Sequence, residues 1–198
     1  MSAQQAIPES TAHAKAGTPA PSHSERALRQ VFIVNAPTSA VWEAWSSAAG
    51  LETFFAAKAN VELKIGCAYE IFFDPTDERF STKGCKLLSY SPQEMISFQW
   101  TLPRDMFPEL ADSPTWVVVQ FRPAGAERTE VSITQLGWGT GENWDRAYGH
   151  MPAGWQMVAK QLEQRFESGP IDWAAQRQLW EERRRESRCA TSDGPLAG

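Results

Sequence analysis

Gln135 is the residue whose type and position in this 198-residue sequence most directly suggest binding chemistry. It lies in the segment TEVSITQL, where Val131, Ile133 and Gln135 share one face if the segment is a strand, because strand side chains alternate between faces. An amide among apolar neighbours needs hydrogen-bond partners. A bound ligand is one possible partner, and a neighbouring backbone group or a water is the other. Gln135 is therefore a candidate polar anchor of an apolar pocket, with a purely structural amide as the alternative.

Eight apolar side chains are predicted to line the same interior as this amide. They occupy inward positions of strand-like segments and one face of a long helical segment. Ligand pockets are mostly apolar with a few placed polar groups, so such a lining suits a small hydrophobic or aromatic molecule. Ordinary core packing is the alternative for each of these side chains. The candidate ligand-binding residues are Phe73, Phe98, Trp100, Val119, Ile133, Gln135, Met151, Trp155 and Val158.

Catalytic chemistry has less support in the sequence. General acid–base catalysis would pair Gln135 with Tyr69 or His150, and an amide transfers protons poorly. His150 also suits a surface turn, and Arg104 with Asp105 suits either a lid over the opening or a solvated loop. The sequence has no Gly-x-Ser-x-Gly, His-Glu-x-x-His, Walker or Cys-x-x-Cys motif. We predict no catalytic residues and leave the question of an enzyme open, with a binding protein favoured.

Net charge and hydropathy exclude two kinds of partner. The formal charge of −5 and the pI near 5.3 argue against a nucleic-acid surface, which needs clustered Lys and Arg. No stretch approaches the roughly 18 to 20 apolar residues of a membrane-spanning helix, and the N-terminus lacks the pattern of a signal peptide. A cytoplasmic protein is expected.

The cysteines and histidines predict neither a disulfide framework nor a metal site. Cys67, Cys85 and Cys189 make an odd number, which fits reduced thiols, although a bridge between Cys67 and Cys85 is an alternative. His13 and His23 have no other metal ligands near them in the sequence. We predict no metal and no cofactor.

A series of strands must position most of the candidate residues. A short apolar run at 31–34 has strand length, and from Val61 onward apolar and polar residues alternate, which is typical of strands with one wet face. Two short helices, TSAVWEAWSS after Pro37 and then AAGLETFF, separate the first strand from the others. The later strands are expected at 61–65, 67–73, 85–90, 96–100, 116–121 and 129–136.

One long helix must supply the remaining candidates. In residues 142–168 the apolar residues Met151, Trp155, Val158, Leu162 and Phe166 recur at the helical repeat, so one face is buried. Proline lacks the backbone N–H that a helix interior needs, so Pro152 predicts either a kink or a helix that begins there. The fold class is therefore α+β, with a curved antiparallel sheet of six or more strands around a long C-terminal helix.

The chain is predicted to form one domain with two tails. Residues 1–26 and 189–198 are polar and small enough in composition to be disordered. The domain covers 27–170, and 171–188 form a helical extension. In that extension Asp172 can cap the helix, and Trp173 and Trp180 can dock on the domain.

Three segments resemble a known family. VNAPTSAVWEAWSSAAGLETFF is similar to the opening strand and helix pair of the family named for the activator of the ninety-kilodalton heat-shock protein ATPase. ITQLGW and GWQMVAKQLEQRFESGPIDW resemble its last strand and final helix. The order of elements over about residues 28–173 is similar to the wider START/SRPBCC superfamily of lipid-transfer domains, polyketide cyclases and birch-pollen allergens, whose fold is called the helix grip. The chain departs from the family at Gln135, where members often carry His, and in the Trp-rich stretch from Trp138 to Trp155.

The resemblance and the residues together give three functional hypotheses. The first is a protein that binds a small hydrophobic or aromatic ligand in a cavity between the sheet and the C-terminal helix. The second is an enzyme of cyclase or hydrolase type that uses the same cavity. The third, which the family name implies together with a role in the stress response, is a module that binds a chaperone partner.

Overall fold

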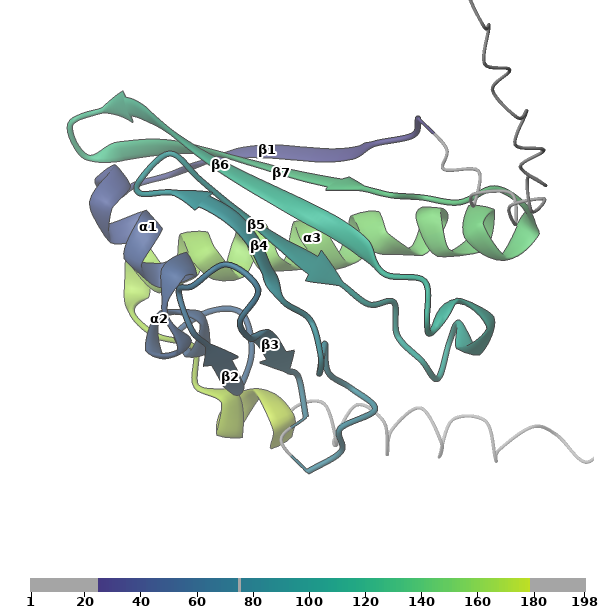
Figure 1. The fold of residues 1–198 in the computed structure, drawn as a ribbon. Coiled ribbons are helices and arrows are strands. Elements are labelled where there is room, and N and C mark those ends of the chain that lie inside the picture. Colours follow the sequence, from purple (N-terminus) through teal and green to yellow (C-terminus); the bar gives the residue numbers. More distant parts are fainter. Residues whose placement is uncertain (1–24, 75, 179–198) are drawn as a thin grey trace, which may run out of the picture.

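Five antiparallel strands form the main sheet, in the order β1-β7-β6-β5-β4 (Figure 1). The computed structural model describes residues 25–74 and 76–178. Neighbouring strands in the sheet are antiparallel, and long β6 and β7 pair from Trp116 with Leu136 to Gly125 with Arg128. The strands are β1 (Leu28–Val34), β4 (Leu87–Ser91), β5 (Met95–Trp100), β6 (Thr115–Gly125) and β7 (Arg128–Leu136).

A second sheet of two strands, β2 (Lys58–Val61) and β3 (Tyr69–Phe72), adjoins the edge of the first. An isolated bridge pairs Ala68 with Lys86, and the Tyr69 N–H donates to the Cys85 carbonyl at 3.0 Å. In the described residues, strands β2 to β7 follow one another as the predicted antiparallel meander, β1 pairs with β7, and the α+β class is confirmed. The strands divide into a sheet of five and a sheet of two.

The predicted strand at 61–65 is wrong, because β2 ends at Val61. Beyond that point the backbone makes tight turns: the Lys64 N–H donates to the Glu62 carbonyl, and the Cys67 N–H donates to the Lys64 carbonyl. Ile65, which alternation placed on a buried face, is 63% exposed. Alternating apolar residues here accompany a turn, since local hydrogen bonds take the place of a partner strand.

Two short helices follow β1, as predicted. They are α1 (Thr38–Ser46) and α2 (Ala48–Glu52), and Ser47 between them caps α2 by accepting a hydrogen bond from the Gly50 N–H at 3.0 Å. Trp45 of α1 and Leu51 of α2 are completely buried. The two helices lie at one end of the main sheet (Figure 1).

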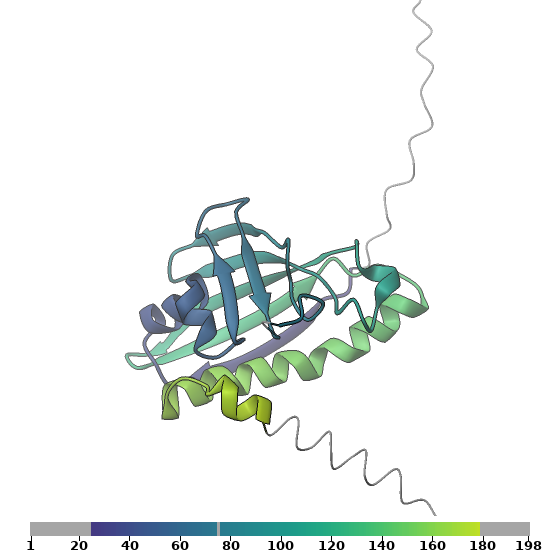
Figure 2. The same cartoon turned by 90° about the horizontal axis from the view of Figure 1, so that it is seen from below.

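Helix α3 (Glu142–Ser168) runs along the sheet and covers one of its faces (Figures 1 and 2). Its bounds are those predicted, and Met151, Trp155, Val158 and Leu162 are buried. Pro152 lies inside the helix, so the alternative of a helix beginning at Pro152 is wrong.

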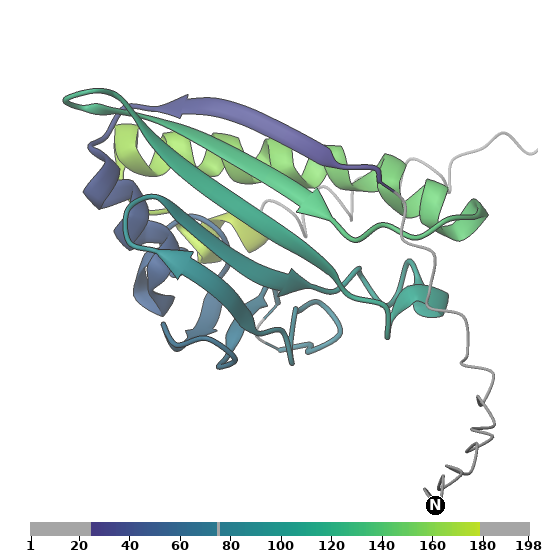
Figure 3. The same cartoon turned by 45° about the horizontal axis from the view of Figure 1, so that its top comes forward.

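The connection between β5 and β6 lies at the N-terminal end of α3 (Figure 3). It contains the 3₁₀ helix η1 (Pro108–Leu110). The Arg146 guanidinium of α3 lies 5.4 Å from the centre of the Phe107 ring and donates to the Met106 carbonyl at 3.4 Å. These contacts join the connection to the helix.

The chain after α3 returns to α2. The Ile171 N–H donates to the Thr53 carbonyl at 2.9 Å, and Trp173 Nε1 donates to the Glu52 carbonyl at 2.6 Å. Asp172 caps residues 173–178 by accepting from two backbone N–H groups, which confirms its predicted role. The predicted tails, apart from residues 25 and 26, and the rest of the helical extension with Trp180 lie outside the described residues.

Substituting Gly50 by Ala tests the packing of α1 on α2. A Cβ at Gly50 would lie 2.7 Å from the Ala44 Cα, which is backbone and cannot move aside cheaply. We expect Gly50→Ala to lower the free energy of unfolding by about 2 kcal/mol, the usual cost of overpacking. Urea denaturation followed by circular dichroism measures it.

Gly154→Ala is the matched control. A Cβ at Gly154 would have open space around it in the middle of α3, and alanine favours a helix over glycine. The free energy of unfolding of this variant is expected to rise by up to about 1 kcal/mol. Equal losses in both variants would show that contact at Gly50 is not the cause.

Candidate functional site

The Gln135 amide is completely buried and links α3 to three strands of the sheet. Trp155 Nε1 on α3 donates to Gln135 Oε1 at 2.8 Å, and Gln135 Nε2 donates to Thr115 Oγ1 at 2.8 Å. The Thr115 hydroxyl in turn donates to the Trp100 carbonyl at 3.0 Å. This chain of hydrogen bonds is called the Gln135 network below.

Strand register explains why these residues meet. Thr115 pairs with Trp100 across β5 and β6, and Gln135 pairs with Val117 across β6 and β7. Gln135 and Thr115 are thus diagonal neighbours on the inward face, a separation that long side chains can span. An indole N–H can only donate, so it must face the amide oxygen, which turns the amide nitrogen toward Thr115.

The backbone of Gln135 is also engaged. Its carbonyl accepts a hydrogen bond from Trp138 Nε1 at 3.0 Å, and Trp138 is completely buried. The side chain of Gln135 therefore accepts a hydrogen bond from the Trp155 indole, and its backbone carbonyl accepts one from the Trp138 indole. The prediction of a buried amide is confirmed in its position, and its partners are the side chains of Thr115 and Trp155, where the alternative had expected a backbone group or a water.

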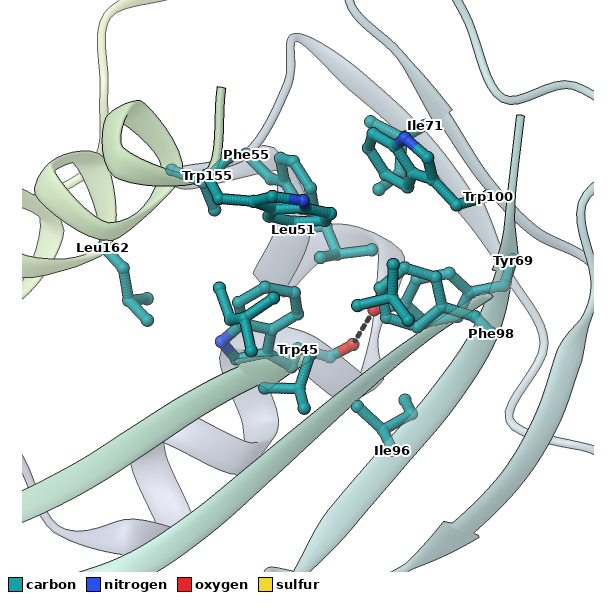
Figure 4. Packing of buried hydrophobic residues seen from close by; sticks show 14 of the residues in the cluster. Trp45, Leu51, Phe55, Tyr69, Ile71, Ile96, Phe98, Trp100, Trp155 and Leu162 are labelled. Carbon is teal, nitrogen blue, oxygen red and sulfur yellow. Dashed lines mark hydrogen bonds between the residues drawn. The ribbon is translucent and has the colours of Figure 1, made fainter. Parts of the chain in front are cut away.

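Four aromatic side chains, Phe55, Phe73, Trp100 and Trp155, form a cluster between α3, β5 and the end of β3, called the Trp100 cluster below. The Trp100 and Trp155 ring centres are 4.9 Å apart, and Phe55 stacks on Trp100 at 5.9 Å with 12° between the planes. Phe73 contacts both Trp100 at 6.2 Å and Phe55 at 6.1 Å. Figure 4 shows Trp155, Phe55 and Trp100 converging from different elements.

The structure buries eight of the nine predicted ligand-binding residues in the interior between the sheet and α3. Phe73, the ninth, follows the end of β3 and is 42% exposed, although its ring touches the buried members of the Trp100 cluster. The aromatic interior thus extends to the surface at Phe73. The eight buried residues are Phe98, Trp100, Val119, Ile133, Gln135, Met151, Trp155 and Val158.

Two buried indole N–H groups have no hydrogen-bond partner among the described residues, those of Trp45 and Trp100. Trp45 is enclosed by the rings of Phe54, Phe55 and Phe98, whereas Trp100 borders the exposed Phe73. A buried donor without an acceptor is costly and unusual in native proteins. Trp100, whose N–H lacks an acceptor, therefore lies beside the point where the aromatic interior reaches the surface.

Tyr69 and Cys85 are buried titratable groups close to this interior. The Tyr69 hydroxyl donates to the Trp45 carbonyl at 2.8 Å, and its ring stacks on Phe98 at 4.2 Å (Figure 4). Burial raises the pKa of Tyr69 well above its ordinary value, and burial also raises the pKa of the Cys85 thiol. Both groups are therefore held in their neutral forms.

The other polar candidates lie on the surface. His150 is an exposed residue of α3, with its ring centre 5.7 Å from that of Phe107. Arg104 and Asp105 are exposed, and Arg104 lies 3.7 Å from Asp112. This arrangement places His150 against the β5–β6 connection, as a surface residue.

Residues 25–74 and 76–178 contain neither a candidate metal site nor a disulfide. There, no group of three or more His, Cys, Asp or Glu side chains could hold a metal ion. Cys67 and Cys85 carry free thiols, and Cys189, His13 and His23 lie outside the described residues. No helix in the described part of the chain is long and apolar enough to cross a membrane.

Sequence reasoning missed two members of the site. Thr115 has the same parity as Val117 and Val119, so alternation would have placed its hydroxyl on the inward face beside Gln135. Phe55 ends the predicted helical segment AAGLETFF, and nothing in its local sequence indicates that its ring stacks on Trp100, forty-five residues later.

An antiparallel sheet that holds one long C-terminal helix against its inner face, with two short helices after the first strand, defines a helix-grip protein. Solved structures share this fold. A protein of Mesorhizobium loti is 20% identical with a TM-score of 0.59, covering 74% of this chain and all of its own. A Bacillus halodurans protein, 20% identical, has a TM-score of 0.55 and covers 71% of this chain and 96% of its own.

A third solved structure is the Aha1 dimer from Colwellia psychrerythraea, 15% identical with a TM-score of 0.52, covering 73% of this chain and 98% of its own. Residues 35–167, more than half of the chain, match the family described as activator of Hsp90 ATPase homolog 1-like protein, and the chain belongs to that family. No curated protein sequence matches the chain.

Replacing Gln135 by Met tests the Gln135 network. Methionine keeps the length of the side chain but leaves the Trp155 N–H without its acceptor, so we expect the free energy of unfolding to fall by about 2 to 3 kcal/mol. Trp155→Phe removes the donor instead. In the double variant the two losses should fall short of their sum by about 1 kcal/mol, because they break the same bond.

Urea denaturation of the wild type, both single variants and the double variant measures this coupling. Trp144→Phe, on the same helix and only partly buried, controls for reducing an indole to a phenyl ring. Fully additive losses would contradict a direct bond between Trp155 and Gln135.

Tyr69→Phe tests the buried hydroxyl through pH. At neutral pH the variant should be less stable by about 1 to 2 kcal/mol, because the Trp45 carbonyl loses a donor. In the wild type the folded pKa exceeds the unfolded value of about 10, so the unfolded chain loses its proton first and stability falls as pH rises above that value. Phenylalanine removes this loss, so the gap between the two proteins should narrow.

Unfolding curves at several values between pH 7 and pH 11 measure the gap, with Tyr90→Phe as a control for removing a tyrosine from the sheet. A gap that widens with pH would contradict burial of a neutral hydroxyl.

Proposed function

We propose that this protein binds a small hydrophobic, aromatic molecule at the Trp100 cluster, between the sheet and α3. The observation that carries the proposal is the exposure of Phe73, which makes a continuous aromatic path from the surface to Trp100 and Trp155. Aromatic rings supply large contact areas and favour stacked or edge-on neighbours, so the cluster suits a flat, apolar guest.

Phe73 is the side chain that a ligand would displace. It lies in the connection after β3, where its backbone N–H donates to the Phe80 carbonyl at 2.9 Å. The backbone is thereby held while the ring, which is partly in solvent, can change rotamer. A guest in the place of this ring would contact Phe55 and Trp100, the two rings that Phe73 now touches.

The cyclase or hydrolase alternative has less support. The Gln135 amide is engaged by Thr115 and Trp155, and the Tyr69 hydroxyl by the Trp45 carbonyl. Neither group is therefore free for acid–base work in its present position. A cytoplasmic location and a role in the stress response stay predictions from the sequence.

The description of the family supports a second candidate, a chaperone-associated module. The direct test adds the purified full chain to purified Hsp90 and measures the rate of ATP hydrolysis. A saturable rise would support this candidate, and a rate unchanged at high excess would contradict it.

The ligand proposal is tested with 2-acetylnaphthalene, a flat two-ring probe. Isothermal titration calorimetry of the full chain should give saturable binding to one site per chain. Phe73→Ala should tighten binding by about fivefold, because the guest no longer has to displace a ring whose contacts with Phe55 and Trp100 are worth about 1 kcal/mol.

Leu88→Ala is the control for calorimetry, because Leu88 is similarly exposed but lies on β4 outside the Trp100 cluster. Spectra of the ¹⁵N-labelled indole groups should show the Trp100 and Trp155 signals moving during the titration. Absence of saturable binding, or movement confined to other indoles, would overturn the proposed site.

A further inference from the structure

The Trp100 indole N–H is the least satisfied polar group at the proposed site. Trp100 is 5% exposed, and its Nε1 atom has no hydrogen-bond partner among the described residues. The fold supplies acceptors to other indoles: Gln135 Oε1 to Trp155, the Gln135 carbonyl to Trp138 and the Glu52 carbonyl to Trp173. Trp45 also lacks an acceptor, but Phe54, Phe55 and Phe98 enclose its ring, whereas Trp100 borders the exposed Phe73. Trp100 therefore carries the unpaired indole donor that lies next to the exposed end of the cluster.

The backbone of Trp100 is held in place, although its indole N–H lacks a hydrogen-bond acceptor. Thr115 donates to the Trp100 carbonyl, and Trp100 pairs with Thr115 in the sheet, so the residue cannot shift along β5 to find an acceptor. A ligand atom that accepts a hydrogen bond at Nε1 would remove the cost of burying the donor. Such a gain applies only to ligands that carry an acceptor.

The surroundings of Trp100 also bear on ligand charge. The four rings in contact with it, those of Phe55, Phe73, Phe98 and Trp155, carry no charge. A carboxylate moved from water to such surroundings without a cation loses far more hydration energy than a ketone or ester does. The cluster therefore favours neutral acceptors over anionic ones.

We infer that the site selects uncharged aromatic molecules that carry a ketone, ester or ether oxygen, with that oxygen accepting a hydrogen bond from Trp100 Nε1. This inference rests on the proposed function and adds the class of ligand to it. Trp100 is then the residue that determines specificity, and Trp155 and Phe55 supply contact area to any flat guest.

Two pairs of probes separate the two features of the ligand. The first pair, 2-acetylnaphthalene and 2-isopropylnaphthalene, has nearly the same shape and differs in the acceptor oxygen. The second pair, methyl 2-naphthoate and 2-naphthoate, differs in charge. Dissociation constants of all four are measured by calorimetry at pH 7 with the full chain.

Trp100→Phe isolates the hydrogen bond, because it keeps an aromatic ring and removes the N–H. The preference for 2-acetylnaphthalene over 2-isopropylnaphthalene, expressed as a ratio of dissociation constants, should fall about fivefold in this variant. Using the ratio cancels the difference in hydrophobicity between the probes. Trp173→Phe, which removes an indole N–H beside α2, should leave the ratio unchanged.

A negative charge on the probe is expected to weaken binding. The methyl ester should bind at least about tenfold more tightly than 2-naphthoate, because only the anion must be buried without a partner. Equal affinity within this pair would overturn the selection against charge.

A direct signal keeps the inference testable if Trp100→Phe does not fold. In the ¹⁵N-labelled wild type, 2-acetylnaphthalene should move the Trp100 indole proton downfield, while 2-isopropylnaphthalene should not. If the neutral probes bind at the cluster with an unchanged ratio and no such shift, the inference is wrong and the proposed function stands. If no neutral probe binds, the proposed function fails as well.

Discussion

The buried amide of Gln135 is the interaction on which the arrangement of helix and sheet depends. Hydrophobic burial holds α3 against the inner face, but burial is non-directional and would tolerate a rotation or a slide of the helix. The bond from Trp155 Nε1 to Gln135 Oε1 has a required distance and direction. Thr115 extends the same constraint to β5, since its hydroxyl accepts from the amide and donates to the Trp100 carbonyl. One side chain thus fixes how the helix sits on three strands.

The Gln135 network also determines how the rings of the Trp100 cluster are arranged. Trp155 is oriented by its bond to Gln135, which presents its ring to Trp100 at 4.9 Å. Trp100 is held through its carbonyl, and its indole N–H has no acceptor among the described residues. Held rings behind an exposed Phe73 suit the proposed binding site, because Trp100 and Trp155 are already in place before a guest arrives.

Local periodicity in the sequence was sufficient to predict α3 and the inward position of Gln135. The repeat of Met151, Trp155 and Val158 gives the bounds and buried face of the helix, since that pattern depends only on helical geometry. Alternation predicted that the Gln135 side chain points inward, but it could not predict its partners. Thr115 is a diagonal neighbour on β6, and Trp155 belongs to α3. Ile65 shows the opposite error, because alternation persisted into a turn whose hydrogen bonds are set by the fold around Gly66. Contacts between distant segments are absent from any local pattern.

The position of α3 at the end of the domain has a consequence for how the chain is made. Synthesis proceeds from the N-terminus, and domains begin to fold as they emerge from the ribosome. The strands from β1 to β7 therefore emerge before α3, and Trp155, the ring of that helix against Trp100, reaches the sheet after them. The pairing of Thr53 with Ile171 closes a loop of more than one hundred residues, a long-range contact of the kind that slows folding. A nascent chain whose strands pair before α3 has emerged thus exposes aromatic surface that the helix later covers.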